Sequence, residues 1–198
     1  MGKDEDNYSE LVDMAERKGA AHARIIDSSD IVVDRRVRLK CEIPVCSSYN
    51  RHLMCPPNIM PVEEFEGIVR TYGKALLVQS EGETDSSDRS DKGISKELDD
   101  SIGPTDSQRA LHRLVNELEA AAFKKGFYLA TGLIGGECLL CAECVSPSSG
   151  EPCRHPFEAR PSMEAMGIDV LKTCEKAGLK INLSSKEKVM WTGIVLLS

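Results

Sequence analysis

The sequence lacks several features by which a protein's partners are recognised. No run approaches the roughly 20 apolar residues of a membrane span, and the first ten residues, MGKDEDNYSE, are polar and acidic rather than signal-like. Basic residues are in the minority, with 25 Lys and Arg against 32 Asp and Glu and a formal net charge of -7, and no basic stripe breaks that balance. These absences predict a cytoplasmic protein that binds neither membrane nor nucleic acid, and whose partners are proteins or small molecules.

Signatures of nucleotide binding and of serine catalysis are also missing. No GxGxxG follows an expected strand, and GxxxxGK[ST] does not occur. No serine stands in the spacing of a nucleophile elbow. A bound NAD or ATP therefore has no support in the sequence, and the chemistry has to come from another residue type.

Cysteine is the residue type that forms a clear pattern. Cys138, Cys141 and Cys144 stand three residues apart, and Cys153 follows after eight intervening residues. Three thiols on one tight loop are typical of proteins that wrap one corner of an iron-sulfur cluster. The intervening residues include proline, glycine and serine, which can turn the chain back and bring the fourth thiolate to the other three.

Zinc and disulfides are the competing interpretations of these cysteines. Zinc also takes four thiolates, but its sites usually pair two well-separated CxxC knuckles, whereas three ligands in a short run favour a larger inorganic core. Disulfides suit an even number of cysteines, and there are eight, yet the spacings are those of ligands and a reducing compartment keeps thiols free. The sequence therefore favours an iron-sulfur cluster of the 4Fe-4S type, with zinc as the alternative.

A second group comprises Cys41, Cys46 and Cys55, with four and then eight residues between them. Prolines around this group make the rigid irregular backbone from which ligand loops are built, and Tyr49 could shield a site from water. In the alternative interpretation these cysteines are small buried apolar residues. We expect them to bind metal, so that the chain holds one or two clusters.

The sequence does not decide how the seven candidate cysteine ligands are distributed between metal sites. Four thiolates ending at Cys153 would fill a four-iron cluster, and the other three would leave one iron open to water, substrate or a non-cysteine ligand. Alternatively Cys174 completes the set of three, all seven form one site, or Cys153 crosses over, as the last cysteine of a ferredoxin run does. The helical spacing of apolar residues around Cys174 favours a core residue instead.

Basic side chains accompany both cysteine groups. Four precede the first group, where we expect a solvated strand face or a cluster that neutralises thiolate-bound metal or an anionic substrate: Arg35, Arg36, Arg38 and Lys40. Candidates for the surroundings of the metal are Arg154, His155 and Arg160, which follow the second group, together with Tyr49.

The remaining sequence predicts one α/β or α+β domain over residues 1–198, in which a mixed sheet is flanked by helices and carries two cysteine-rich metal loops. Helices are expected over residues 7–18, 61–73 and 105–126, and from a cap at Ser162 through Cys174. Strands are expected at 23–26, 31–33, 74–79, 127–133 and 188–197. Residues 80–103 are acidic and poor in large apolar side chains, which predicts a mobile insertion.

The cysteine motifs resemble those of the predicted metal-binding proteins known as domain of unknown function 2284. The matching pieces are Arg38-Leu39-Lys40-Cys41, Cys46, Tyr49, Cys55-Pro56-Pro57, Cys138, Cys141, Cys144, Cys153-Arg154-His155-Pro156, Pro161-Ser162-Met163-Glu164-Ala165 and Gly167-Ile168-Asp169-Val170. The resemblance covers nearly the whole chain apart from the acidic insertion. It implies a cysteine-rich iron-sulfur protein of bacterial and archaeal cytoplasm and leaves Cys174 outside the pattern, but it implies no reaction, because the family has no settled one.

Three functions fit these residues, and we rank them in order. The first is a small redox protein, or an oxidoreductase component, that passes single electrons to a protein partner. The second is an enzyme that uses an open iron site as Lewis acid or sulfur carrier on a small anionic substrate. The third is a zinc-stapled interaction module without chemistry.

Overall fold

The computed structural model describes residues 3–83, 106–179, 181 and 188–198, and its centre is an antiparallel sheet. The described strands are β1 (His22–Asp27), β2 (Lys74–Glu83), β3 (Thr131–Leu133) and β4 (Lys188–Leu197). They lie side by side in the order β1-β2-β4-β3. This order places β2 and β4 at the centre of the sheet. Each neighbouring pair of these strands runs antiparallel.

The central strands are apolar on both faces. Along β2, Leu76 and Val78 join one core cluster while Ala75 and Leu77 join the other. β4 alternates between the same two clusters. A strand that is covered on both faces needs apolar residues at successive positions. This explains the nearly continuous apolar runs KALLVQ and KVMWTGIVLL.

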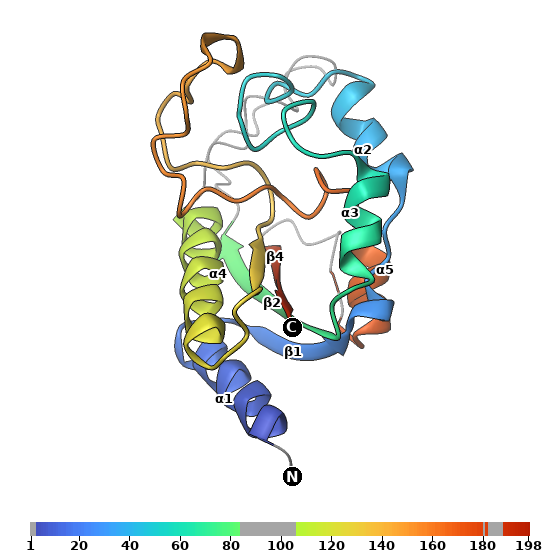
Figure 1. The fold of residues 1–198 in the computed structure, drawn as a ribbon, viewed down its shortest axis with the longest axis vertical. Helices are drawn as coiled ribbons and strands as arrows, with labels where there is room; N and C mark the ends of the chain where they lie inside the picture. Colours follow the sequence, from blue (N-terminus) through green and yellow to red (C-terminus); the bar gives the residue numbers. More distant parts are fainter. Residues whose placement is uncertain (1–2, 84–105, 180, 182–187) are drawn as a thin grey trace.

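Helices cover both faces of this sheet (Figure 1). Helices α1 (Lys3–Arg17) and α4 (Asp106–Lys124) contribute to the core cluster on one face. Helices α3 (Val62–Val69) and α5 (Val170–Lys176) contribute to the cluster on the other face. α4 buries an apolar stripe of Leu111, Leu114, Val115, Leu118 and Ala122, and each fully buried leucine stabilises the fold by roughly 1.5–3 kcal/mol.

The predicted α+β domain is confirmed, with one difference in the sheet and one in the basic segment. The described strands pair antiparallel throughout instead of forming a mixed sheet. The basic segment, expected on a strand face, is instead helix α2 (Arg35–Glu42). Asp34 starts this helix because its carboxylate accepts a hydrogen bond from the backbone N–H of Arg36 at 2.9 Å, as an N-cap does.

Other boundaries also differ from the prediction. In place of the expected strand at 31–33, irregular chain follows a 3-10 turn at Ser28–Asp30 and makes only an isolated bridge between Val33 and Ile168. β3 begins only at Thr131, because residues 127–130 form a turn. The last helix begins at Val170, capped by Asp169, while Ser162 caps a turn and accepts a hydrogen bond from the N–H of Ala165.

The predicted acidic insertion begins later than expected, because β2 continues to Glu83. Its remaining part, residues 84–103, lies outside the described residues. Among the described helices, none has the length and apolar character needed to cross a membrane.

Two long irregular segments gather at the end of the molecule opposite α1 (Figure 1). We call residues 41–60 the first cysteine loop and residues 135–161 the second cysteine loop. The first begins in the last turn of α2 and ends before α3, and the second follows β3. The layered core therefore carries both cysteine groups on one end.

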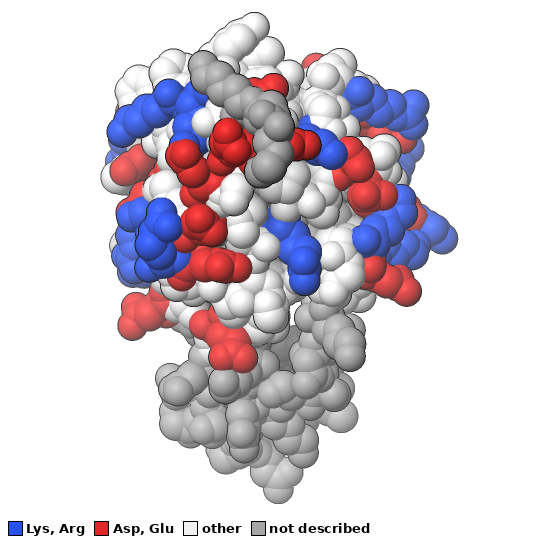
Figure 2. Space-filling model, turned by 90° about the horizontal axis from the view of Figure 1, so that it is seen from below, with Lys and Arg blue, Asp and Glu red and all other residues white. Residues whose placement is uncertain are grey.

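The opposite end has a mixed surface charge. Seen from below, Lys and Arg side chains alternate with Asp and Glu side chains and do not gather into a single basic face (Figure 2).

Candidate metal centre

The first cysteine loop is closed at its base by a buried arginine. Arg38 is 9% exposed, and its guanidinium donates a hydrogen bond of 2.7 Å to the backbone carbonyl of Met60. Within the loop, the backbone N–H of Asn50 donates to the carbonyl of Pro56 at 2.8 Å. These bonds fix both ends of the segment that holds the three cysteines, although most of it is neither helix nor strand.

The second cysteine loop is closed by backbone pairing at the edge of the sheet. Ile134 donates its N–H to the carbonyl of Pro161 at 3.1 Å, and its carbonyl accepts from the N–H of Met163 at 2.8 Å. Between these contacts the chain leaves the sheet through Gly135 and Gly136, as predicted. Gly136 has φ +72°, and a side chain there would also overlap the amide of Gln108, so only glycine fits without strain.

The four cysteines of the second loop line a common cavity. Cys138, Cys141, Cys144 and Cys153 surround a space of about 20 Å³, which is close to the volume that one water molecule needs. The turn that brings Cys153 back is a short 3-10 helix, Pro147–Ser149, which ends at Gly150 in the left-handed conformation.

Residues of both loops complete the wall of this cavity. The first loop contributes His52, Leu53 and Met54, and the second contributes Leu140 and His155. The apolar side chains among them reduce the access of water to the thiols.

The thiols of the first group are near enough to influence one another electrostatically. Cys55 is 8% exposed, and burial raises the pKa of its thiol to about 12, helped by the negative charges of Glu137, Cys46, Cys41 and Cys138. Burial likewise raises the pKa of Cys41, followed by the charges of Cys46 and Glu164. Without metal, these buried thiols stay protonated at neutral pH.

The two groups are neighbours rather than separate sites. The hydroxyl of Ser48 in the first loop donates a hydrogen bond to the carboxylate of Glu137, which directly precedes Cys138. The charge of Cys138 also acts on Cys55 across the two loops. Seven of the eight cysteines therefore occupy one end of the molecule.

Cys174 is a core residue, as the sequence indicated. It is fully buried in the cluster under α3 and α5, and Gln79 donates a hydrogen bond to its sulfur at 3.6 Å. Burial raises the pKa of its thiol to about 11. It is therefore unsuited to complete either cysteine group.

The basic residues before Cys41 have individual partners. The guanidinium of Arg36 lies 2.5 Å from a carboxylate oxygen of Asp34, and that of Arg35 lies 3.6 Å from Glu63. Together with Arg38 they line a cavity of about 420 Å³ between α2 and the start of α3. Lys40 is exposed and does not line it.

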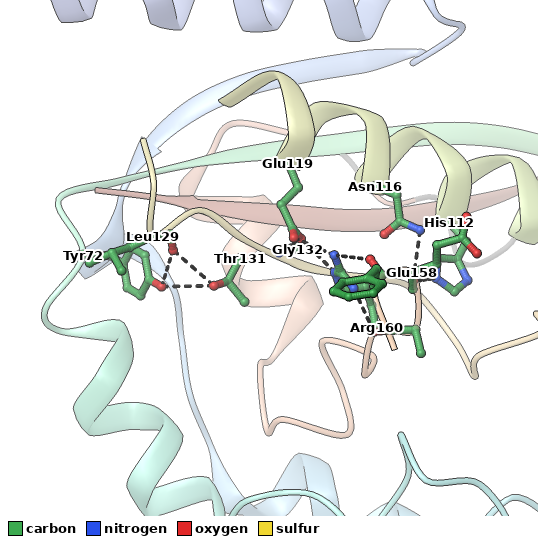
Figure 3. A network of polar contacts seen from close by, with 11 residues as sticks. Tyr72, His112, Asn116, Glu119, Leu129, Thr131, Gly132, Glu158 and Arg160 are labelled. Carbon is green, nitrogen blue, oxygen red and sulfur yellow. Dashed lines mark hydrogen bonds and ion pairs between the residues drawn. The ribbon is translucent and has the colours of Figure 1, made fainter. Parts of the chain in front are cut away.

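Arg160 is held by helix α4. Its guanidinium contacts both carboxylate oxygens of Glu119, at 2.5 and 2.8 Å, and Glu119 also accepts the N–H of Gly132 at 2.6 Å (Figure 3). Both side chains of the pair are largely buried. Arg160 therefore anchors the end of the second loop to α4 and β3.

Other residues of α4 extend this anchor. The backbone carbonyl of Glu158 lies 2.8 Å from Nε2 of His112 and accepts a hydrogen bond of 3.0 Å from the amide of Asn116 (Figure 3). Burial lowers the pKa of His112. The sequence prediction missed Asn116 and Glu119, although His112, Asn116 and Glu119 recur at the spacing of one helix face beside the apolar stripe.

The other candidate residues have more local contacts. Arg154 donates a hydrogen bond of 2.8 Å to the carbonyl of Glu143 across the second loop. His155 donates its backbone N–H to the sulfur of Cys153 at 3.3 Å, and its Nδ1 lies 3.3 Å from the carboxylate of Glu158. Tyr49 is half-buried, and its backbone N–H bonds the carbonyl of Cys46 at 3.0 Å.

The donor chemistry fits a soft metal, while the present side-chain positions do not yet form a coordination shell. All eight cysteines are free thiols, and four of them line one cavity. Across the part of the chain that the structure describes, no three His, Cys, Asp or Glu side chains converge closely enough to hold a metal ion. Coordination by the second loop therefore requires its thiols to rotate or its backbone to adjust.

Comparison with known proteins gives one match. The profile of domain of unknown function 2284, a family described as predicted metal-binding proteins, matches residues 24–197. Neither a curated protein nor a solved structure matches the chain.

Proposed function

The chain belongs to the predicted metal-binding proteins of domain of unknown function 2284, and from this premise we propose that it is a cytoplasmic iron-sulfur protein that transfers single electrons to a protein partner. The observation that carries the proposal is the cavity lined by Cys138, Cys141, Cys144 and Cys153. Four thiolates from one loop are the ligand set of a 4Fe-4S cluster, and when bound such a cluster supplies a one-electron redox couple.

The residues around the four thiols would tune such a cluster. The N–H of His155, bonded to the sulfur of Cys153, favours the more negatively charged, reduced state. Leu53, Met54 and Leu140 line the same cavity and would cover part of such a cluster with apolar side chains. Arg154 holds the loop in shape through the carbonyl of Glu143.

The first group would hold a second metal centre beside the first. Cys41, Cys46 and Cys55 supply three thiolates, one fewer than a four-iron cluster takes from cysteine alone. Burial raises the pKa of the Cys41 and Cys55 thiols, so metal uptake by these two releases protons and weakens as the pH falls.

Metal analysis tests the proposal directly. Protein purified without oxygen should be brown, should contain iron and acid-labile sulfide, and should bleach reversibly on reduction. The Cys141→Ser and Cys144→Ser variants should lose cluster signal, whereas Cys174→Ser should keep it, because Cys174 lies in the core. A colourless protein with bound zinc and no redox signal would instead identify a zinc-stapled module and end the proposal.

A second candidate is an enzyme that acts on a small anionic substrate at an open iron site. The cavity of about 420 Å³ lined by Arg35, Arg36 and Arg38 favours it, because it lies beside the helix that carries Cys41. A small carboxylate such as citrate should then change the electron paramagnetic resonance spectrum of the reduced protein, and Arg36→Gln should weaken this change. Citrate without effect on the spectrum contradicts this candidate and leaves electron transfer untouched.

A further inference from the structure

A buried carboxylate lies where the second cysteine loop returns to the core. Glu164 follows the bridge between Ile134 and Ser162 by two residues. Its oxygen Oε2 is buried and has no hydrogen-bond partner among the residues that the structure describes. An unpartnered carboxylate oxygen is unfavourable in a protein interior unless it is protonated or binds a cation.

The other oxygen of the Glu164 carboxyl group, Oε1, is fixed by hydrogen bonds. The backbone N–H of Gly136, the hydroxyl of Ser162 and the N–H of Glu164 itself bond the carboxyl group. Because Oε2 takes none of these bonds, they fix Oε1 and leave Oε2 as the free acceptor. The side chain is thus oriented by the start of the second cysteine loop.

Glu164 also lies close to the first cysteine group. Its charge acts on the thiol of Cys41, the cysteine at the end of α2. The carboxyl group is therefore bonded to Gly136, two residues before Cys138, and is near enough to Cys41 to raise the pKa of that thiol.

We propose that Glu164 is a metal ligand, with its Oε2 completing the set of Cys41, Cys46 and Cys55. The inference rests on the proposed function, because it requires the first group to bind metal. A carboxylate is a harder and more exchangeable donor than a thiolate, so this position is where water or an anionic ligand would enter.

Two other residues compete for this position. Glu137 acts on Cys55, but its carboxylate already accepts a hydrogen bond from Ser48. Cys174 bonds Gln79 inside the core under α3 and α5. Glu164 is the candidate whose oxygen is both buried and unpartnered.

The test isolates the first group in the full-length chain. In a chain carrying Cys138→Ser and Cys141→Ser, Co²⁺ titration should give thiolate charge-transfer bands, and X-ray absorption should count three sulfur ligands. Adding Glu164→Gln, which keeps the shape of the side chain, should weaken Co²⁺ binding at least 10-fold.

Two matched variants separate a ligand from a mere nearby charge. Glu42→Gln removes another negative charge that acts on Cys41, from an exposed side chain, and should change the affinity less than 3-fold. Glu137→Gln should leave three sulfurs and near-normal affinity. If Glu137→Gln weakens binding and Glu164→Gln does not, the assignment is overturned.

A gain-of-ligand variant keeps the test decisive if Glu164→Gln unfolds the chain. Glu164→Cys should raise the sulfur count from three to four, and a count that stays at three overturns the proposal. Absence of any Co²⁺ binding in the parent chain would overturn metal binding by the first group itself. Normal binding by Glu164→Gln would overturn only the role of Glu164.

Discussion

At the scale of single residues, the cysteine-rich end depends on a few positions where a substitution is costly. Gly136 combines a positive φ with contact to Gln108 and starts the second cysteine loop. Cys174, by contrast, has the same side chain as the candidate ligands but lies in the apolar core. Position in the fold, rather than residue type, separates the core cysteine from the candidate metal ligands.

Replacing Gly136 by alanine should destabilise the protein by about 2–3 kcal/mol, because the Cβ would be strained and would overlap the Gln108 amide. Gly150→Ala is the matched control, since Gly150 has φ +71° but no atom within 4 Å of the added Cβ. It should cost about 1 kcal/mol. Urea unfolding of the three proteins measures the difference, and equal losses would refute the steric argument.

Cys174 should make stability fall in alkaline solution. Its pKa is raised by burial from 9.0 to about 11, so the folded state holds a proton that the unfolded state has released between these values. The resulting stabilisation is complete below pH 9 and is lost as the pH rises through 11, with an upper limit of about 3 kcal/mol from a shift of two units. The free energy of unfolding measured at pH 8 and pH 11 should fall more for the wild type than for Cys174→Ala. Parallel declines would contradict the assignment.

At the scale of the elements, α4 does more than cover the sheet. One face of the helix supplies the apolar stripe, and the adjacent polar face holds the end of the second cysteine loop through His112, Asn116 and Glu119 (Figure 3). An irregular loop has few backbone bonds of its own, so contacts with a rigid helix determine how well its ligands are placed. The helix thus connects the core to the candidate metal site.

The pair of Arg160 and Glu119 should therefore matter more than an ion pair on the surface. Arg160→Ala removes two hydrogen bonds to a largely buried carboxylate and should cost about 2–4 kcal/mol. Arg70→Ala breaks the exposed pair with Glu66 and should cost about 0.5 kcal/mol. Chemical denaturation of both variants checks the ratio, and similar losses would argue against the anchoring role.

At the scale of the whole molecule, elements that follow a local sequence pattern could be predicted, whereas contacts between distant segments could not. The apolar runs of β2 and β4 predicted central strands, and the capping signals and apolar stripe predicted α4. α2 was mistaken for a strand because Arg36 to Lys40 alternate charged and apolar residues in the manner of a strand. The antiparallel pairing of β2 with β4 joins segments more than 100 residues apart, for example Leu77 with Ile194, which no local pattern encodes.

The candidate site likewise combines features that the local sequence predicts with contacts that it does not. The spacing of Cys138, Cys141 and Cys144 is local, so it could be read directly. The contact of Ser48 with Glu137 spans 89 residues, and the pair of Glu119 and Arg160 spans 41. Glu164 belongs to a motif of the family resemblance but was not predicted as a ligand, because a single glutamate between methionine and alanine carries no signal of metal binding before folding buries it.

The arrangement of core and loops predicts what metal removal does to the whole protein. The two core clusters consist mainly of residues from the sheet and its helices and include none of the seven candidate ligands. Chelation under reducing conditions should therefore loosen both cysteine loops while the sheet and α4 stay folded. Hydrogen exchange should become faster in residues 41–60 and 135–161 and stay slow in β2, β4 and α4. Loss of protection from hydrogen exchange across β2 and β4 would instead mean that metal binding and folding are one event, as in a zinc-stapled module. The layered core would then be unfolded without metal.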